Sequence, residues 1–180
     1  MRPYILAIDP GTKASGVCLV RTAELKPLWC AKLENRILVD YVIKVLSKDL
    51  DIALEQMLHG IQVVIERMQG NSMPVSSDVF LTCEWIGRFD TDFHNILNET
   101  TEFVFRRDEY KKLCANIYSR NDKGIRSALV DRFAYGQKNY GKGTAKAPGW
   151  FHGFSADTWS AYAIAVTFFD MCAEKEITVY

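Results

Sequence analysis

Short apolar runs recur along the chain, and five of them predict β-strands. Each run is rich in β-branched or other apolar side chains and ends at a turn-forming or charged residue. Pro10, Gly11 and Gly16 separate the first two runs, so residues 5–20 predict a hairpin. The predicted strands cover residues 5–8, 17–20, 27–33, 61–65 and 102–105.

Longer segments carry apolar residues at steps of three and four, which predicts amphipathic helices. These helices cover residues 36–58, 77–97, 107–117, 122–133 and 155–173. Their expected N-caps include Ser76 or Ser77, Asn121 or Asp122, and Ser155. Residues 135–149 form a Gly- and Lys-rich loop. The order of elements predicts an α/β fold, and the absence of a linker or repeat predicts a single domain over residues 1–180.

The composition is typical of a globular protein, with 48% hydrophobic and 24% charged residues among 180. No apolar run approaches the roughly 20 residues of a membrane span, and we expect no membrane association. The N-terminus lacks the pattern of a signal peptide. The five cysteines are scattered and include no CxxC pair, which indicates neither a zinc site nor a disulfide framework. We therefore expect a reducing, cytoplasmic location.

The net charge is zero, but it is unevenly distributed. Residues 106–146 contain 11 Lys and Arg against 4 Asp and Glu, a net charge of +7, and the rest of the chain balances it. A basic segment on an acidic scaffold is compatible with a local site for a polyanion. A solvated loop and helix face is the open alternative.

Two of the predicted strands end in a carboxylate, Asp9 and Glu66. A carboxylate at the end of a buried strand is costly unless a cation neutralises it, and parallel neighbouring strands would bring these two together. Asp157 lies in the first turn of the last predicted helix, where it is either a third acid or a helix-capping residue. Crowded carboxylates suit Mg²⁺ or Mn²⁺, and two such ions would clamp the oxygens of a phosphodiester displacement.

These residues resemble RuvC, the Holliday-junction resolvase of the RNase H-like superfamily. The resemblance covers most of the chain in element order, and residues 121–126 are similar to the family's basic junction-contacting region. The matching stretches are Ile8-Asp9-Pro10-Gly11-Thr12 with Gly16, Val64-Ile65-Glu66, and Ala156-Asp157 before residues 161–165.

The resemblance implies an RNase H-like fold with a mixed five-stranded sheet flanked by helices. It also implies a metal-dependent endonuclease that resolves four-way or related branched DNA as a homodimer, with two Mg²⁺ or Mn²⁺ ions in each active site. Asp9, Glu66 and Asp157 would be the catalytic metal ligands. The chain would be a divergent member, bacterial or of a phage type that acts in the host cytoplasm.

One position departs from the family pattern. The family presents two metal-site residues three apart before the last helix's Ala-rich stretch, and here those positions are Asp157 and Ser160. The fourth carboxylate is therefore missing. Either three carboxylates suffice or His152 contributes from the preceding loop, although an ordinary loop residue or a phosphate contact is the stronger alternative for His152.

Basic residues in the second half of the chain fit a DNA ligand, because phosphate contacts supply salt-sensitive affinity without sequence information. Tyr140, Trp150 and Phe151 either stack on an unpaired base or, for the last two, pack in the core. The expected DNA-binding residues are Thr12, Lys13, Lys111, Lys112, Lys123, Arg126, Lys138, Lys142 and Lys146.

Two other functions remain open at this stage. The first is a RuvC-like DNA-binding module that has lost catalysis, which the absence of an acid at Ser160 favours. The second is a nucleotide-binding phosphotransferase of the actin and sugar-kinase type, because Asp9-Pro10-Gly11-Thr12 also matches the Asp-x-Gly-Thr of those proteins. They need two such lobes, and this chain contains one such motif.

Overall fold

A five-stranded mixed sheet lies at the centre of the protein. The computed structural model describes residues 1–49, 59–70, 76–115 and 117–177. The strands are β1 (Tyr4–Asp9), β2 (Ala14–Arg21), β3 (Lys26–Glu34), β4 (Ile61–Arg67) and β5 (Glu102–Phe105). Their order across the sheet is β3-β2-β1-β4-β5. The first three strands pair antiparallel, whereas β4 pairs parallel with both β1 and β5.

The predicted strands and the predicted α/β class are confirmed. Each of the five predicted runs lies inside an observed strand, and the first two form the expected hairpin. The helices are α1 (Leu38–Lys44), α3 (Ser77–Leu97), α4 (Arg106–Glu109), α5 (Asp122–Phe133) and α6 (Ala156–Ile177). Among the helices described, none has the length and hydrophobicity needed to cross a lipid bilayer.

Two predicted helices are shorter in the structure than the apolar spacing suggested. The segment predicted over residues 36–58 begins with a 3-10 turn, continues as α1 and passes into a π-helical turn at Val45–Asp49; residues 50–58 lie outside the described part. The helix predicted over residues 107–117 is α4 followed by a π-helical turn, and it ends at Ala115, whose φ is 43°. Helical spacing identifies the buried face but does not distinguish α from π turns.

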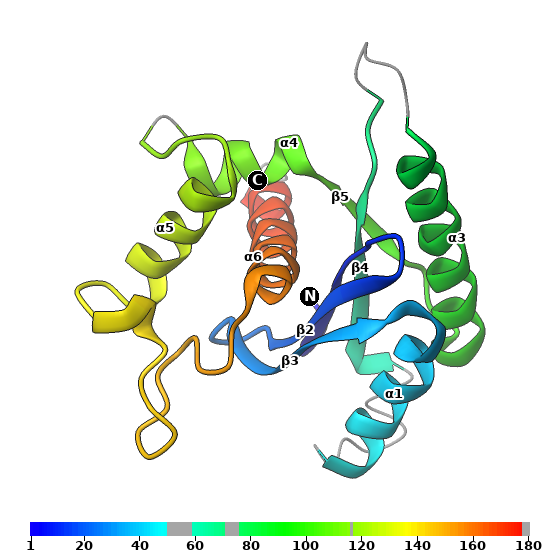
Figure 1. The fold of residues 1–180 in the computed structure, drawn as a ribbon, viewed down its shortest axis with the longest axis horizontal. Coiled ribbons are helices and arrows are strands. Elements are labelled where there is room, and N and C mark those ends of the chain that lie inside the picture. Colours follow the sequence, from blue (N-terminus) through cyan, green and yellow to red (C-terminus); the bar gives the residue numbers. More distant parts are fainter. Residues whose placement is uncertain (50–58, 71–75, 116, 178–180) are drawn as a thin grey trace.

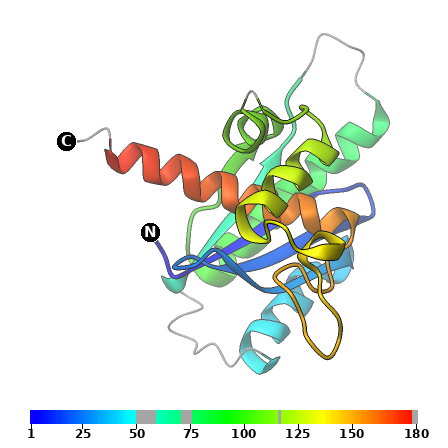
Figure 2. The ribbon, with the colours of Figure 1, turned by 90° about the vertical axis from the view of Figure 1, so that its left-hand side faces the viewer.

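The alternation of side chains along β1 places its residues in two cores, one on each face of the sheet. Ile5 and Ala7 belong to a core that α5 and α6 cover, whereas Leu6 and Ile8 belong to one that α1 and α3 cover. Figure 1 shows the sheet between these two pairs of helices. Helix α6 runs along its face of the sheet, and its C-terminal turns extend beyond it (Figure 2).

Aromatic residues anchor the end of the loop between α5 and α6 in the core. Phe151 is fully buried, and Trp150 stacks on Phe133 with ring centroids 5.3 Å apart. Trp150 Nε1 donates to the Tyr162 hydroxyl at 3.1 Å, and that hydroxyl donates to the carbonyl oxygen of Leu25 at 2.8 Å. Phe151 therefore packs in the core, and the alternative that it stacks on a DNA base is wrong. Trp150 is half-buried and packs against this core, and its stacking on a DNA base stays a prediction. Tyr140 remains exposed.

Cys18 and Cys30 are partners in the register of β2 and β3, and the structure joins them in a disulfide. The sequence indicated no disulfide, because the two residues show no motif spacing and become neighbours only through the strand register. Among the described residues, Cys83 and Cys114 are free cysteines.

The first turn of α6 lies directly on β2 at Gly16. A Cβ atom at Gly16 would lie 2.3 Å from the backbone oxygen of Asp157, closer than any real contact allows. Glycine at this position thus permits the helix that carries Asp157 and Ser160 to approach the sheet.

We expect Gly16→Ala to lower the free energy of unfolding by about 1–3 kcal/mol, because the added methyl group must push α6 away from β2. Gly87→Ala is the matched control. Gly87 lies on the exposed side of α3 with no atom within 4 Å of an added Cβ, and alanine there should stabilise the helix by about 0.5–1 kcal/mol. Urea unfolding of both variants measures the difference; equal stabilities would contradict the close approach.

Candidate active site

The ends of β1 and β4 place Asp9 and Glu66 next to each other. The two strands are parallel neighbours with Ile8 opposite Ile65, so the residues that follow lie at the same edge of the sheet. The two carboxyl groups lie close enough for each to affect the pKa of the other. The structure therefore brings together the two acids that the sequence placed at strand ends.

Hydrogen bonds from distant residues fix the turn that follows Asp9. The Gly11 amide donates to Ser15 Oγ at 3.2 Å, and that hydroxyl donates to the side-chain oxygen of buried Asn35 at 2.7 Å. Asn35 Nδ2 in turn donates to the Gly11 carbonyl at 2.8 Å. The backbone beside Asp9 is thus held by a residue at the far end of β3, which limits its motion.

A cavity of about 560 Å³ opens beside the acid pair. The end of β4, helix α4, the start of α5 and the first turns of α6 all contribute to its wall. The lining residues are Asp9, Glu66, Arg67, Met68, Gln69, Arg106, Arg107, Tyr110, Asp122 and Ser160. The end of β1 and the π-helical turn that carries Tyr110 also contribute, so several separate elements converge on this cavity.

Burial is the main cause of the unusual electrostatics of the acid pair. It raises the pKa of Asp9, and the negative charge of Glu66 raises it further. Burial also raises the pKa of Glu66, with the charge of Glu109 as the next contribution. The Arg106 guanidinium opposes these shifts in both carboxyls without cancelling them. The positive charge near these two acids is therefore too small to offset the effect of burial on their pKa values.

Glu109 is a third acid near the pair, and sequence reasoning missed it. Its side chain is 0% exposed and its Oε2 accepts a hydrogen bond from Arg106 Nη1 at 2.9 Å. Arg106 Nη2 pairs with Asp122 at the start of α5. Burial raises the pKa of Glu109 to about 8, although Arg106 lowers it. The sequence offered one signal for Glu109: it lies three residues after Arg106, in the helix that directly follows β5, and β5 pairs parallel with β4.

Asp157 and Ser160 take different positions at the start of α6. Ser160 lines the cavity, whereas Asp157 Oδ2 lies 2.9 Å from Lys32 Nζ of β3. The charge of Asp157 still contributes to the raised pKa of Asp9, so it lies within electrostatic reach of the pair. The predicted role of Asp157 as a ligand stays a prediction.

His152 lies in the loop before α6. It is exposed, and its Nδ1 is 3.3 Å from the carbonyl oxygen of Lys142. The cavity wall in the described part of the chain is formed by other residues. The role of His152 stays a prediction.

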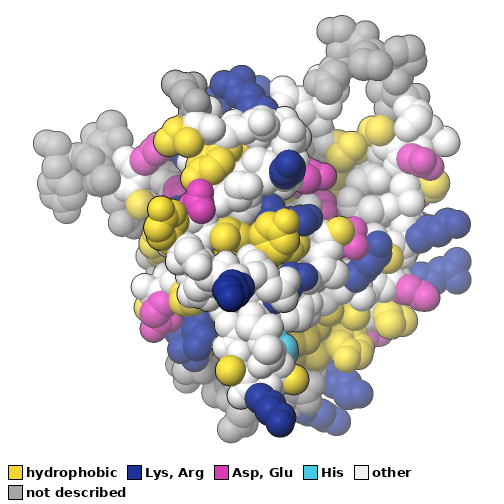
Figure 3. Space-filling model, turned by 60° about the vertical axis from the view of Figure 1, so that its left-hand side comes forward, with side chains coloured by type: hydrophobic (Ala, Val, Ile, Leu, Met, Phe, Trp, Pro, Cys, Tyr) yellow, Lys and Arg dark blue, Asp and Glu magenta, His cyan; other side chains and the backbone are white. Residues whose placement is uncertain are grey.

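The basic residues predicted to contact DNA differ in whether their side chains already interact with other groups of the protein. Lys112 pairs with Glu174, the Arg126 guanidinium lies 5.5 Å from the Trp159 ring centroid, and Lys142 Nζ donates to the Phe154 carbonyl at 2.7 Å. On the face shown in Figure 3, Lys and Arg side chains lie at several separate places with Asp and Glu between them. The remaining members comprise half-buried Thr12 and the exposed Lys13, Lys111, Lys123, Lys138 and Lys146.

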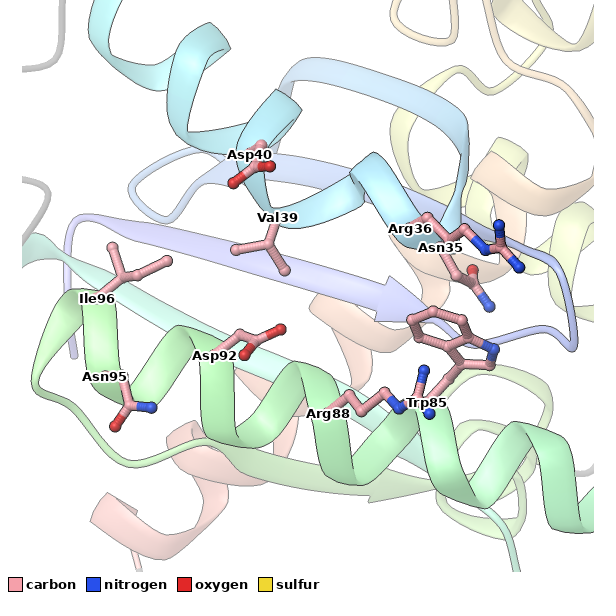
Figure 4. Close-up of a pocket in the computed structure, with 9 residues that line it drawn as sticks. All are labelled: Asn35, Arg36, Val39, Asp40, Trp85, Arg88, Asp92, Asn95 and Ile96. Carbon is pink, nitrogen blue, oxygen red and sulfur yellow. The ribbon is translucent and has the colours of Figure 1, made fainter.

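A second cavity, of about 470 Å³, lies between α1 and α3 on the opposite face of the sheet (Figure 4). Arg88 stacks on Trp85 there, with Cζ 4.7 Å from the ring centroid, and Asp40 and Asp92 offset the local positive charge. This cavity is lined by a balanced mixture of charges. The acid pair lines the other cavity, where we place the candidate chemistry.

Comparison with solved structures identifies the fold. No family model and no curated protein sequence matches the chain. The chain superposes on RuvC from Thermus thermophilus with a TM-score of 0.60 and 14% identity, covering 95% of this chain and 96% of that one. The chain has the RuvC fold. A second structure, T. thermophilus RuvC in complex with a Holliday junction substrate, gives the same TM-score at 13% identity, with 94% and 95% covered.

The superposition confirms the predicted resemblance to RuvC and the RNase H-like α/β fold at the level of the backbone. The low identity agrees with the expectation of a divergent chain.

The donor groups at the acid pair fit a hard divalent cation. Asp9 and Glu66 offer carboxylate oxygens, and the second oxygen of buried Glu109 has no hydrogen-bond partner among the described residues. Within the part of the chain that the structure describes, no three His, Cys, Asp or Glu side chains converge closely enough to hold an ion as they stand. A bound ion would therefore require these side chains to adjust.

We expect the metal-free protein to lose stability as the pH rises from about 4.5 to about 8. A carboxyl with a raised pKa keeps its proton when folded but releases it when unfolded, so the native state binds more protons in this window. Urea midpoints at several pH values in EDTA measure the slope, and Asp9→Asn should make it shallower because one such carboxyl is gone. A wild-type slope equal to that of the variant would contradict the raised pKa of Asp9.

Proposed function

We propose that this protein is a divalent-metal-dependent endonuclease that cleaves four-way or related branched DNA. The observation that carries the proposal is the adjacent, half-buried pair of Asp9 and Glu66 at one edge of the sheet, which lines a polar cavity. The structural relative with the same fold is described in complex with a Holliday junction substrate. A fold alone leaves function open, so the argument rests on the site.

Asp9, Glu66 and Asp157 would hold Mg²⁺ or Mn²⁺, two ions in each site. Ions bound there lower the pKa of water and stabilise charge on the attacking and leaving oxygens of a phosphodiester. The chain's own contribution is to hold the carboxyl groups in place and to oppose part of the rise in their pKa. The Arg106 charge favours the ionised forms of Asp9 and Glu66, and the Ser15–Asn35 hydrogen bonds hold the backbone next to Asp9.

DNA binding would come from exposed basic residues in the second half of the chain. Lys138 and Lys146 are exposed in the loop between α5 and α6, and Tyr140 between them is 55% exposed. Phosphate contacts of this kind supply affinity without reading sequence. An exposed tyrosine can stack on an unpaired base of a branched substrate.

A homodimer is part of the proposal, because two symmetric cuts need two active sites. Helix α3 exposes large apolar side chains on the sheet face opposite α6, among them Phe80 at 62% and Leu81 at 44%. Exposed apolar side chains on one helix are a feature of association surfaces. The location would be the cytoplasm, bacterial or of a phage-infected host.

The uncharged Ser160 in the cavity favours a second candidate function, that of a module that binds branched DNA without cutting it. Incubation of the protein with a labelled four-way junction and Mg²⁺ or Mn²⁺, beside linear duplex, separates the two. Symmetric nicks in the junction support the nuclease. Tight junction binding with no nicks supports the binding module and overturns the proposal.

We expect Asp9→Asn, Glu66→Gln and Asp157→Asn each to reduce junction cleavage by at least about 100-fold, because loss of even an outer partner of a metal site costs 10- to 100-fold. Junction binding should stay close to that of the wild type. Glu102→Gln, an exposed acid at the other end of β5, is the control and should cut normally. Near-normal cleavage by any of the three variants would remove that residue from the site.

We expect the affinity for the junction to fall steeply with salt, and the double variant Lys138→Gln/Lys146→Gln to flatten this dependence. Each lost phosphate contact should lower the log–log slope by about 1. Lys142 is left intact because its ammonium group holds the Phe154 carbonyl. Lys26→Gln/Lys44→Gln removes two exposed charges elsewhere and should leave the slope unchanged. Equal slopes in both double variants would place the DNA on another surface.

A further inference from the structure

Glu109 is a buried acid with a hydrogen bond to only one of its two carboxylate oxygens. Its side chain is 0% exposed, and Oε2 accepts from Arg106 Nη1 at 2.9 Å. Its other oxygen, Oε1, is buried and has no hydrogen-bond partner in the described part of the chain. A buried carboxylate oxygen without a donor or cation is costly, and such groups are retained where a ligand satisfies them.

The position of Glu109 brings it to the acid pair rather than to an isolated core. Helix α4 directly follows β5, in which Val104 is the register partner of Glu66. The same helix packs against α6, which carries Ser160 on the cavity wall. The charge of Glu109 also acts on Glu66, and that of Asp9 acts on Glu109. Glu109 itself does not line the cavity, but its partner Arg106 does, so a cation there is within electrostatic reach of all three acids.

Arg106 is the cation that shares the cavity with these acids. Its Nη1 bonds to Glu109, and its Nη2 pairs with Asp122, whose side chain is 76% exposed. The guanidinium thus has a second, solvent-facing partner. It can leave Glu109 for Asp122 without losing all of its ion pairing.

We propose that Glu109 supplies the carboxylate that Ser160 lacks: its free oxygen binds a divalent ion together with Asp9 and Glu66, and the ion displaces Arg106 toward Asp122. This inference rests on the proposed metal-dependent function. It assigns a metal ligand to α4, because the corresponding position on α6, Ser160, carries a hydroxyl instead of a carboxylate. Arg106 then acts as the resident counter-ion of the ion-free state.

Titration of Mn²⁺ into the protein by calorimetry at pH 8 tests the proposal without any DNA or cleavage. Glu109→Gln keeps the size of the side chain and an oxygen that accepts from Arg106, but removes the charge. We expect it to weaken Mn²⁺ binding at least about tenfold and to reduce the Mn²⁺-induced rise in Tm. Asp122→Asn removes the other carboxylate partner of Arg106 and should weaken binding far less, because that charge is exposed and screened.

Arg106→Gln tests the same proposal from the opposite direction and does not depend on the folding of the Glu109 variant. Removal of the competing cation should strengthen Mn²⁺ binding and enlarge the Mn²⁺-induced rise in Tm. If Glu109 only holds Arg106 in place, the Arg106→Gln variant should show no gain in affinity for Mn²⁺. Ser160→Asp in the Glu109→Gln background should restore Mn²⁺ binding, because it returns a carboxylate to the cavity wall.

The outcomes separate this inference from the proposed function. Wild-type Mn²⁺ affinity in Glu109→Gln, or no gain in Arg106→Gln, overturns the inference and leaves the nuclease proposal standing. Mn²⁺ binding that depends on Glu109 in a protein that cuts no junction supports the inference and overturns the nuclease. A wild-type protein that binds no Mn²⁺ at all overturns both.

Discussion

The parallel pairing of β1 with β4 is the constraint on which the candidate site depends. A parallel pair aligns the carboxyl ends of its strands, so an acid at the end of each is brought to one edge of the sheet whatever the rest of the chain does. Both strands are buried on both faces, which fixes their register: a slip of one residue would exchange the α1–α3 core for the α5–α6 core. The geometry of Asp9 and Glu66 is therefore as well determined as the core itself.

This placement has an energetic cost that the surrounding residues only partly offset. Desolvation and the charge of Glu66 raise the pKa of Asp9, and desolvation and the charge of Glu109, a buried acid, raise that of Glu66. Arg106 is positioned to reduce these shifts and is itself held by two acids. An arrangement with excess buried negative charge is poor for stability alone. It is reasonable only where a cation or a positively charged reaction centre completes it.

The sequence predicted the sheet and the two strand-end acids because both follow from local patterns. The sequence shows an apolar run that stops at Asp9 and another that stops at Glu66. The two acids are neighbours because a single crossover connection makes the two strands a parallel pair. Glu109 could not be found in this way, since it stands in a run of charged residues that burial alone distinguishes. Trp150 and Phe151 were ambiguous because their loop gives no periodicity. The pairing of Cys18 with Cys30 depends on the register between β2 and β3, which the spacing of the two residues does not encode.

The buried Asn35 has a consequence for the order in which the protein can mature. It holds the turn after Asp9 from the far end of β3, so the first acid acquires its fixed backbone only once all three antiparallel strands have assembled. A nascent or partly unfolded chain would expose the same carboxylate on a mobile turn, with no defined partner across the sheet. Competence to hold an ion is thereby coupled to completion of the hairpin layer. A nuclease built on this plan would stay inert toward nucleic acid until its folding is finished.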